Sequence, residues 1–367
     1  MKNMILIIGN GFDLQCGLKS TYNDFFEYKK NNNEIYKLFF KNENEFWCDI
    51  FGCEQSFTSN FTIWDMLFIL KSNNHHKRWC DIEKEILDTF LLDNTNHCFW
   101  DKVLIHYKER KKEDKEVYRN DPIEFKLGFF LFCVDSTLND IDDFVELIFD
   151  HLKKFEESFS KYLSKEITSQ YNKNTIILFN KLFTLDNDSS IGESENRVVI
   201  SFNYTNHRQH ILKKVCSIYA NIHGRIDAEP ANIIFGIDDY EMQSEQRNYL
   251  PQATIFSKSV RIITNPLQPN ESLLRDRINN IVIYGHSLNK ADYSYFQSIF
   301  DHYDLYKSNV VLWFAFSKHK YFSEENYINS IRTLIVEYGK TLDNKDHGKN
   351  LFHKLLLENR IKKVEIN

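Results

Sequence analysis

The stretch that most constrains the fold of this chain is its start, where the apolar run Met4–Ile8 leads directly into Gly9-Asn10-Gly11. Five apolar residues in a row are typical of a strand buried on both faces, as in a parallel sheet. A strand that ends in glycine brings bare backbone to the carboxyl edge of the sheet, where N–H groups can approach a phosphate. The third glycine of a dinucleotide-binding fingerprint is missing, because position 14 is Leu. An ordinary tight turn is therefore an equally good interpretation of this motif taken alone.

The composition excludes several classes of protein. The 367 residues are 42% hydrophobic and 27% charged, as in globular proteins, and the formal net charge of −6 gives no indication of nucleic-acid binding. The N-terminal apolar run is too short for a signal peptide, and no run approaches the roughly 18 residues of a membrane span. Seven cysteines without a Cys-x-x-Cys pair favour reduced thiols. We therefore expect a cytoplasmic protein with no membrane partner.

A zinc site is the one metal centre that the sequence could assemble. Its ligands would come from Cys48, Cys53, His75, His76 and Cys80. Their spacing fits no common zinc finger, and buried free thiols are far more frequent. We expect no metal.

The first half of the chain has a helical pattern. Helices are expected over Phe25–Phe40 and residues 61–70, 81–87 and 144–162, where apolar residues recur at helical spacing and charges take the opposite face. Alternating β-branched runs are rare in this block. We expect a helical insertion over residues 41–185.

The pattern changes after the turn-rich segment 186–192. Short apolar strands are expected at residues 198–202, 218–222, 233–235, 281–284 and 310–314, with a crossover helix over 207–217. A strand, helix and strand within about 25 residues form a βαβ unit and imply a parallel sheet. The N-terminal strand cannot form a sheet alone, so it must pair with these strands. The predicted fold is a doubly wound, Rossmann-like α/β domain, mostly parallel, made of residues 1–40 and 186–367; two separate domains are the alternative.

Polar residues follow several of the expected strands. Asn203-Tyr204 follows one strand, His223-Gly224 the next, and Gly285-His286-Ser287 a third. Ligands of open parallel sheets bind outside the carboxyl ends of the strands, so these residues and the Gly-x-Gly turn are expected at one edge.

Each of these residues also has an ordinary structural interpretation. Asn203 could cap a helix beginning near Thr205, and His223 could be a satisfied turn histidine. Ser287 could cap the helix over 291–300, with Asp292 at its positive end. Tyr204 and Phe12 could belong to the core. These interpretations stay open at the level of sequence.

The motifs together resemble the AbiH family of bacterial phage abortive-infection proteins. The resemblance rests on the segment 7–25, with its Gly-Asn-Gly-Phe-Asp, and on Phe202–Asn206, Ile222-His223-Gly224, Phe235-Gly236 and Gly285-His286-Ser287-Leu288-x-x-x-Asp292. The helical middle matches only through Trp79-x-Asp81-x-Glu83. The resemblance implies an antiphage effector.

The order of the motifs is similar to that of sirtuin-like NAD-consuming domains. This second resemblance implies that Gly9, Asn10 and Gly11 line the phosphates of NAD, that Asn203 and His223 lie at the scissile N-glycosidic bond, and that Ser287 contacts a ribose. The wider set expected to contact the nucleotide adds Phe12, Tyr204, Gly224, Gly285, His286 and Asp292. The chain lacks the Cys-x-x-Cys pairs of the structural zinc of sirtuin deacylases and has Phe12-Asp13 where a small residue and Ser are usual. These departures argue against a protein deacylase.

The predicted activity is hydrolysis of NAD to nicotinamide and ADP-ribose. The transition state resembles an oxocarbenium ion, so the site must orient the ribose more than supply a strong nucleophile. His223 could accept a proton, and Asn203 could hold the attacking water. Asp13 could stabilise positive charge or merely cap the turn, and both roles stay open.

Two other functions remain as alternatives. The chain could be a nucleotide-sensing or protein-interaction module without turnover, with the helical block as its working surface. A nuclease has less support, because the acidic residues of Asp121–Lys126 are too close in sequence to come from two strands. A homo-oligomer formed through the helical block and a phage-derived activator are the expected partners besides the nucleotide.

Overall fold

The computed structural model describes residues 3–52, 61–74, 82–110, 117, 120–135, 137–138, 140–185, 197–208, 216–228, 232–242, 248–264, 272–318 and 322–366. The contacts divide the chain into two compact units. The sheet unit comprises residues 1–20, 163–232 and 262–367, and the helical unit comprises residues 21–162 and 233–261. The boundaries expected from the sequence, 41 and 185, stay a prediction of domain organisation, because compact units need not coincide with domains.

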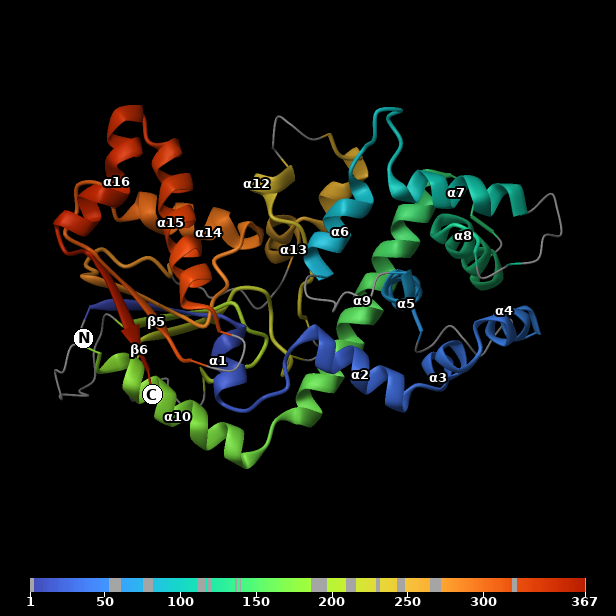
Figure 1. Cartoon of the computed structure of the whole chain (residues 1–367), viewed down its shortest axis with the longest axis horizontal. Helices are drawn as coiled ribbons and strands as arrows, with labels where there is room; N and C mark the ends of the chain where they lie inside the picture. The colour runs from blue at the N-terminus through green and yellow to red at the C-terminus, as the bar shows by residue number, and fades with distance from the viewer. Residues whose placement is uncertain are drawn as a thin grey trace. The chain divides into compact units, whose positions relative to one another are not determined.

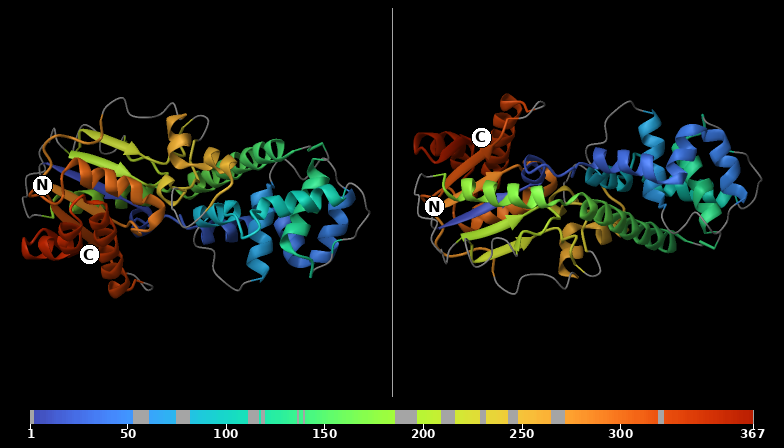
Figure 2. Two further views of the ribbon diagram at one scale, coloured as in Figure 1. Left: turned by 90° about the horizontal axis from the view of Figure 1, so that it is seen from above. Right: turned by 90° about the horizontal axis from the view of Figure 1, so that it is seen from below.

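The sheet unit is built on six strands that are all parallel. Their order is β3-β2-β1-β4-β5-β6, so the chain fills one half of the sheet, returns past β1 and then fills the other half (Figures 1 and 2). The strands are β1 (Met4–Ile8), β2 (Arg197–Ser201), β3 (Ile218–Asn221), β4 (Asn280–Tyr284), β5 (Val311–Phe316) and β6 (Ile361–Glu365). This is the strand order of the doubly wound Rossmann fold, so the predicted parallel α/β sheet is confirmed.

Helices cover both faces of the sheet, which is why β1 can be entirely apolar. Figure 1 shows α10 (Ser169–Phe183) on one side of the sheet and the pair α15 (Glu324–Thr341) and α16 (Lys345–Leu357) on the other. All five residues of β1 are buried. On one face, Ile5 and Ile7 share a core with side chains of α14 (Tyr293–His302), α15 and α16. The short α1 (Asn10–Gln15) and η2 (Lys290–Asp292) follow β1 and β4.

The helical unit has a core dominated by aromatic rings. Phe25 packs edge-on against Phe155 and Phe159, and Trp64 packs against Trp100. Its elements are α2 (Tyr22–Asn32), α3 (Glu34–Lys41), α4 (Glu43–Gly52), α5 (Ile63–Asn74), α6 (Ile82–Phe90), α7 (Phe99–Arg110), α8 (Ile123–Val134), most of α9 (Ile141–Glu166), α12 (Asp239–Met242), η1 (Pro251–Phe256) and most of α13 (Lys258–Ile263). The last four residues of α9 and the last two of α13 belong to the sheet unit.

Buried charges in this unit are paired. The Lys29 ammonium lies 2.5 Å from Asp65 Oδ1, which also accepts a hydrogen bond from the Tyr36 hydroxyl at 2.7 Å. Arg261 forms two hydrogen bonds to Glu156, whose Oε1 accepts the amide proton of Phe235 at 2.7 Å. Both clusters join segments that are distant in sequence, so they fix the packing of this unit.

Several expected elements differ from the structure. The expected helix 25–40 is two helices, because Asn33 ends α2 and its side chain caps α3. The expected strand 233–235 is wrong: these residues form no strand, and the backbone of Phe235 pairs with Glu156 and Arg261 instead. Strand β6 was not expected. The turn-rich segment 186–192 and most of the expected crossover helix, residues 209–215, lie outside the described residues.

Candidate functional site

The register of the sheet brings the predicted polar residues into one row. Ile8 of β1 pairs with Ser201 of β2 and with Tyr284 of β4, and Ser201 pairs with Asn221 of β3. Adjacent strands lie about 4.8 Å apart. Four polar residues lie two positions beyond this row, each just past the end of its strand: Asn10 after β1, Asn203 after β2, His223 after β3 and His286 after β4. The convergence at the carboxyl edge that the sequence predicts is therefore present.

Asn203 has the most unusual environment of this row. Its side chain is 96% buried, and neither its Oδ1 nor its Nδ2 has a hydrogen-bond partner among the residues that the structure describes. Such a group costs about 1–3 kcal/mol relative to one that is paired. The alternative interpretation as a helix cap does not hold, since residues 203–207 are not helical.

The backbone of Asn203 is held from two sides. Its amide donates to the Ser201 hydroxyl at 3.2 Å, and its carbonyl oxygen accepts from Asn221 Nδ2 at 2.7 Å. The same Asn221 amide donates to the carbonyl oxygen of Thr205 at 2.8 Å. The loop after β2 is thereby fixed to β3, so the position of the Asn203 side chain is set by the sheet.

His223 and His286 lie on either side of one carboxylate. His223 Nε2 is 3.5 Å from Asp292 Oδ1, and His286 Nε2 is 3.2 Å from Asp292 Oδ2. Both imidazoles are buried, and the carboxylate is somewhat more exposed, at 14% of its side chain. The ring of Phe202 packs edge-on against both, at 5.4 and 4.8 Å. The carboxylate of Asp292 therefore lies within ion-pair distance of both histidines.

Close backbone contact explains the glycines after β1 and β4. The amides of Gly9 and Gly11 donate to the carbonyl oxygens of Tyr284 and Gly285, at 3.1 and 2.8 Å. A Cβ on Gly9 would lie 2.7 Å from the Cα of His286. These two N–H groups therefore already donate to main-chain carbonyl oxygens. The expected contact with a phosphate required them as free donors. The phosphate contact of Gly9, Asn10 and Gly11 stays a prediction that must use other atoms.

Two further glycines are required by their backbone. Gly224 has φ +82° and Gly285 has φ +67°, a conformation that residues with a side chain rarely adopt. They turn the chain directly after His223 and directly before His286. Each turn therefore lies next to a histidine whose Nε2 is within 4 Å of the Asp292 carboxylate.

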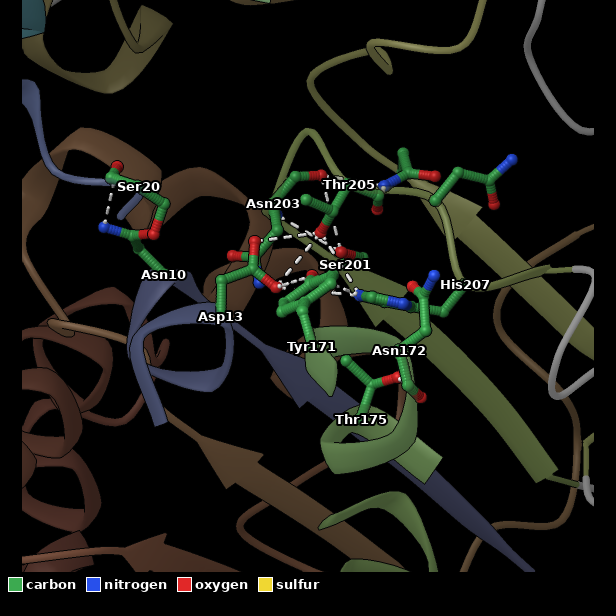
Figure 3. A network of polar contacts seen from close by, with 12 residues as sticks. Asn10, Asp13, Ser20, Tyr171, Asn172, Thr175, Ser201, Asn203, Thr205 and His207 are labelled. Carbon is green, nitrogen blue, oxygen red and sulfur yellow. Dashed lines mark hydrogen bonds and ion pairs between the residues drawn. The ribbon is translucent and has the colours of Figure 1, made fainter. Parts of the chain in front are cut away.

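Asp13 lies in a buried network rather than at an open site (Figure 3). Its carboxylate accepts from the Tyr171 hydroxyl at 2.7 Å and from the Thr205 hydroxyl at 2.9 Å. His207 Nε2 is 3.6 Å from Asp13 and within 3.3 Å of both hydroxyl oxygens. Burial, with the charge of Asp13 next, raises the pKa of Tyr171 far above its usual value. Of its two open roles, the geometry favours a structural one, joining α1, α10 and the loop after β2.

The remaining predicted residues are partly accounted for by local contacts. Phe12 is fully buried, 4.4 Å from Phe179, which fits its interpretation as core. The exposed Asn10 pairs with the hydroxyl of Ser20 at 2.5 Å. Ser287 is exposed, and Tyr204 is half-buried. Contact of these residues with a nucleotide stays a prediction.

The part of the chain that the structure describes holds no cluster of three or more His, Cys, Asp or Glu side chains suited to a metal ion. The zinc ligands weighed from the sequence fall on Cys53, His75, His76 and Cys80, outside the described residues, and on Cys48, whose side chain is not described. Among the described helices, none is long and apolar enough to cross a membrane.

Sequence reasoning missed Tyr171, Thr205 and His207 as partners of Asp13, and it missed the pairing of Asp292 with both histidines. Asp13 and Tyr171 are 158 positions apart, so no local pattern could pair them. A usable signal was present in the sequence, because Thr205 and His207 are polar residues at alternate positions directly after Asn203-Tyr204.

The fold and the site together define an α/β protein with a Rossmann-like parallel sheet and a row of polar residues at its carboxyl edge. The family model described as bacteriophage abortive infection AbiH matches residues 5–314, and the chain belongs to this AbiH family. Membership implies a role in bacteriophage abortive infection. Comparison with curated proteins gave no match.

Proposed function

We propose that this AbiH protein binds NAD at the carboxyl edge of its sheet and hydrolyses the N-glycosidic bond to nicotinamide. The observation that carries the proposal is the buried carboxamide of Asn203, unpaired among the described residues and in register with His223. A ribose offers neighbouring hydroxyl groups that both donate and accept, so it can satisfy both ends of this amide.

The strand order supports a ligand at this edge. The order reverses between β1 and β4, and ligands of such sheets bind in the crevice outside the carboxyl ends at that point. Asn10 and Ser287 are exposed directly after these two strands. In the proposal they face the pyrophosphate and a ribose, while the amides of Gly9 and Gly11 stay paired with the carbonyl oxygens of Tyr284 and Gly285.

The proposed reaction consumes one water molecule. The water oxygen bonds to C1′ of the ribose while the bond from C1′ to the nicotinamide nitrogen breaks, and that electron pair neutralises the pyridinium. His223 takes the proton released by the water and passes it to solvent. Asn203 orients the water or the ribose hydroxyl. Asp13 supports the fold in this scheme and does not touch the substrate.

The test is incubation of the purified protein with NAD, with nicotinamide followed by chromatography. Loss of the imidazole in His223→Ala is expected to slow release about a hundredfold or more, as for other general bases. Asn203→Ala is expected to slow it by about ten- to a hundredfold, the equivalent of one lost hydrogen-bonding group. The matched controls Asn350→Ala and His353→Ala change exposed side chains of α16 and are expected to retain wild-type turnover.

Two outcomes would change the proposal. Turnover that is unaffected by both Asn203→Ala and His223→Ala would overturn the assignment of the site. Tight binding of NAD without release of nicotinamide, also after addition of phage lysate as a source of activator, would favour a nucleotide sensor.

A further inference from the structure

Asn221, the last residue of β3, holds the loop after β2 through its side chain. Its Nδ2 donates to the carbonyl oxygen of Asn203 at 2.7 Å and to that of Thr205 at 2.8 Å. Both partners are main-chain carbonyl oxygens, which only accept, so the atom that faces them must be the nitrogen, and both of its hydrogens are used. One half-buried side chain therefore fixes two residues of the loop.

The residue between these two is tied to the segment that follows β3. The carbonyl oxygen of Tyr204 accepts the amide proton of Ile226 at 3.0 Å. Since His223 lies between Asn221 and Ile226 in the sequence, the loop that carries Asn203 is joined to the chain on both sides of His223. The two predicted catalytic residues are thus carried by segments that are bonded to each other.

The main chain of Asn203 is held, whereas its side chain is not. Its amide donates to the Ser201 hydroxyl at 3.2 Å, and its carbonyl oxygen accepts from Asn221. Neither end of its buried carboxamide has a hydrogen-bond partner among the described residues. A loop that could move would turn such a group toward a partner or toward water, because an unpaired buried amide is unfavourable. The hold on the main chain therefore keeps the carboxamide in place for a ligand.

We propose that Asn221 is a positioning residue, which acts through Asn203 by fixing the loop after β2 to the strand that leads to His223. Its role in hydrolysis rests on the proposed function, whereas its hold on the loop does not. Asn221 touches no substrate in this scheme. Without its two donors, the Asn203 carboxamide loses its fixed place relative to His223, and the reacting groups are aligned less often.

The hold on the loop is tested by hydrogen exchange of the full chain, followed by mass spectrometry of peptides that cover residues 202–208 and 222–228. Asn221→Asp keeps the shape of the side chain but turns a carboxylate oxygen toward the two carbonyl oxygens. Both peptides are expected to exchange about tenfold faster than in the wild type, while a peptide that covers β5 is unchanged. Asn350→Asp makes the same change at an exposed position of α16 and is expected to exchange as the wild type.

Two exchange results would overturn the hold. One is unchanged exchange of both peptides in Asn221→Asp, and the other is equal acceleration of the β5 peptide, which would show a general loss of stability. Asn221→Ala removes the donors without adding a charge and is expected to give the same pattern as Asn221→Asp.

A double-mutant cycle separates positioning from a purely structural role. Asn221→Ala is expected to lower kcat/KM for NAD by about tenfold in the otherwise wild-type protein. In the Asn203→Ala protein it is expected to lower kcat/KM by less than about threefold, because a residue that acts through Asn203 has nothing left to position there. An equal loss in both proteins, or no loss in either, would contradict the positioning role.

The two proposals can fail separately. If the wild type releases no nicotinamide, the proposed function fails together with the role of Asn221 in hydrolysis, while hydrogen exchange still decides whether Asn221 holds the loop. If the wild type releases nicotinamide but the two substitutions act independently, only the positioning role is lost.

Discussion

The amide nitrogen of Gly11 lies 2.8 Å from the carbonyl oxygen of Gly285, so the segments that follow β1 and β4 touch through their main chains. A Cβ on Gly9, Gly11 or Gly285 would lie within 2.7 Å of a main-chain atom of the other segment. The Gly-x-Gly turn is thereby explained by the packing of two strand ends at the point where the strand order reverses. Any ligand at this edge lies over the contact rather than within it.

Gly11→Ala is expected to destabilise the sheet unit. The added Cβ would lie 2.7 Å from the Cα of Gly285, and neither atom belongs to a flexible side chain. Overpacking of this kind costs about 1–3 kcal/mol. Urea unfolding followed by circular dichroism measures the loss. Gln15→Ala, an exposed change on the same helix, should leave stability within about 0.5 kcal/mol, and equal stability of the two variants would contradict this explanation.

Asp13→Ala is expected to destabilise the protein by about 1–3 kcal/mol for each buried hydroxyl that loses its acceptor. The change leaves the hydroxyls of Tyr171 and Thr205 without their acceptor. Thermal unfolding measures the effect. A folded Asp13→Ala protein of wild-type stability that has lost only NAD turnover would favour a catalytic role for Asp13 instead.

The sequence predicts the central strands well because each of them is an uninterrupted apolar run. The edge strand β6 escaped prediction, since Lys362, Lys363 and Glu365 give it the charges of an exposed strand. The prediction of a strand at residues 233–235 failed in the opposite way. This apolar run is buried like a strand, but the Phe235 amide donates to the Glu156 side chain instead of to a neighbouring strand. The hydrophobic pattern of a sequence indicates which residues are buried, but it does not indicate which residues they pack against.

The same limit applies to the site. The sequence analysis identified Asn203, His223 and His286 because each follows an apolar run, and such a run can be recognised in the sequence. The link from Asp292 to both histidines depends on the turn at Gly285 and on the side-by-side placement of β3, β2, β1 and β4. The sequence analysis placed Asp292 at a helix start and among the nucleotide contacts, but not beside the two histidines.

His151 is expected to make stability depend on pH. Its Nδ1 accepts the amide proton of Ile63 at 2.9 Å, and burial, with a smaller effect of Lys154, lowers its pKa from 6.5 to about 4. The unfolded chain takes up this proton near pH 6.5 and the folded chain only near pH 4. Between these values the unfolded state binds more protons, so stability falls as the pH falls, by about 2 kcal/mol from pH 7 to 5.

The measurement is urea unfolding at pH 7 and pH 5, followed by fluorescence of the buried Trp64 and Trp100. His151→Asn provides an acceptor without the titration and is expected to show a smaller loss at pH 5. The exposed control His353→Asn should behave as the wild type. The same pH dependence in His151→Asn and the wild type would contradict the assignment.

The buried thiols of the sheet unit are expected to be unreactive. Burial raises the pKa of Cys16 and of Cys216 to about 12 in each case, so almost no thiolate exists at neutral pH. Native protein treated with iodoacetamide at pH 7.5 should carry no label on either residue by peptide mass spectrometry, whereas urea-unfolded protein should carry it on both. Rapid labelling of Cys16 in the native state would show that α1 opens from the sheet.

The most direct test of the central claim is the affinity of the protein for an NAD analogue that cannot be hydrolysed because a methylene group replaces the ribose ring oxygen. Isothermal titration compares the wild type with Asn203→Ala and with the exposed control Asn350→Ala. We expect Asn203→Ala to bind about ten- to a hundredfold more weakly, as one lost polar contact of about 1–3 kcal/mol requires, and the control to bind as the wild type does. Equal affinity of all three proteins, or no binding by the wild type, would contradict the claim that the buried amide of Asn203 is the nucleotide contact of this sheet.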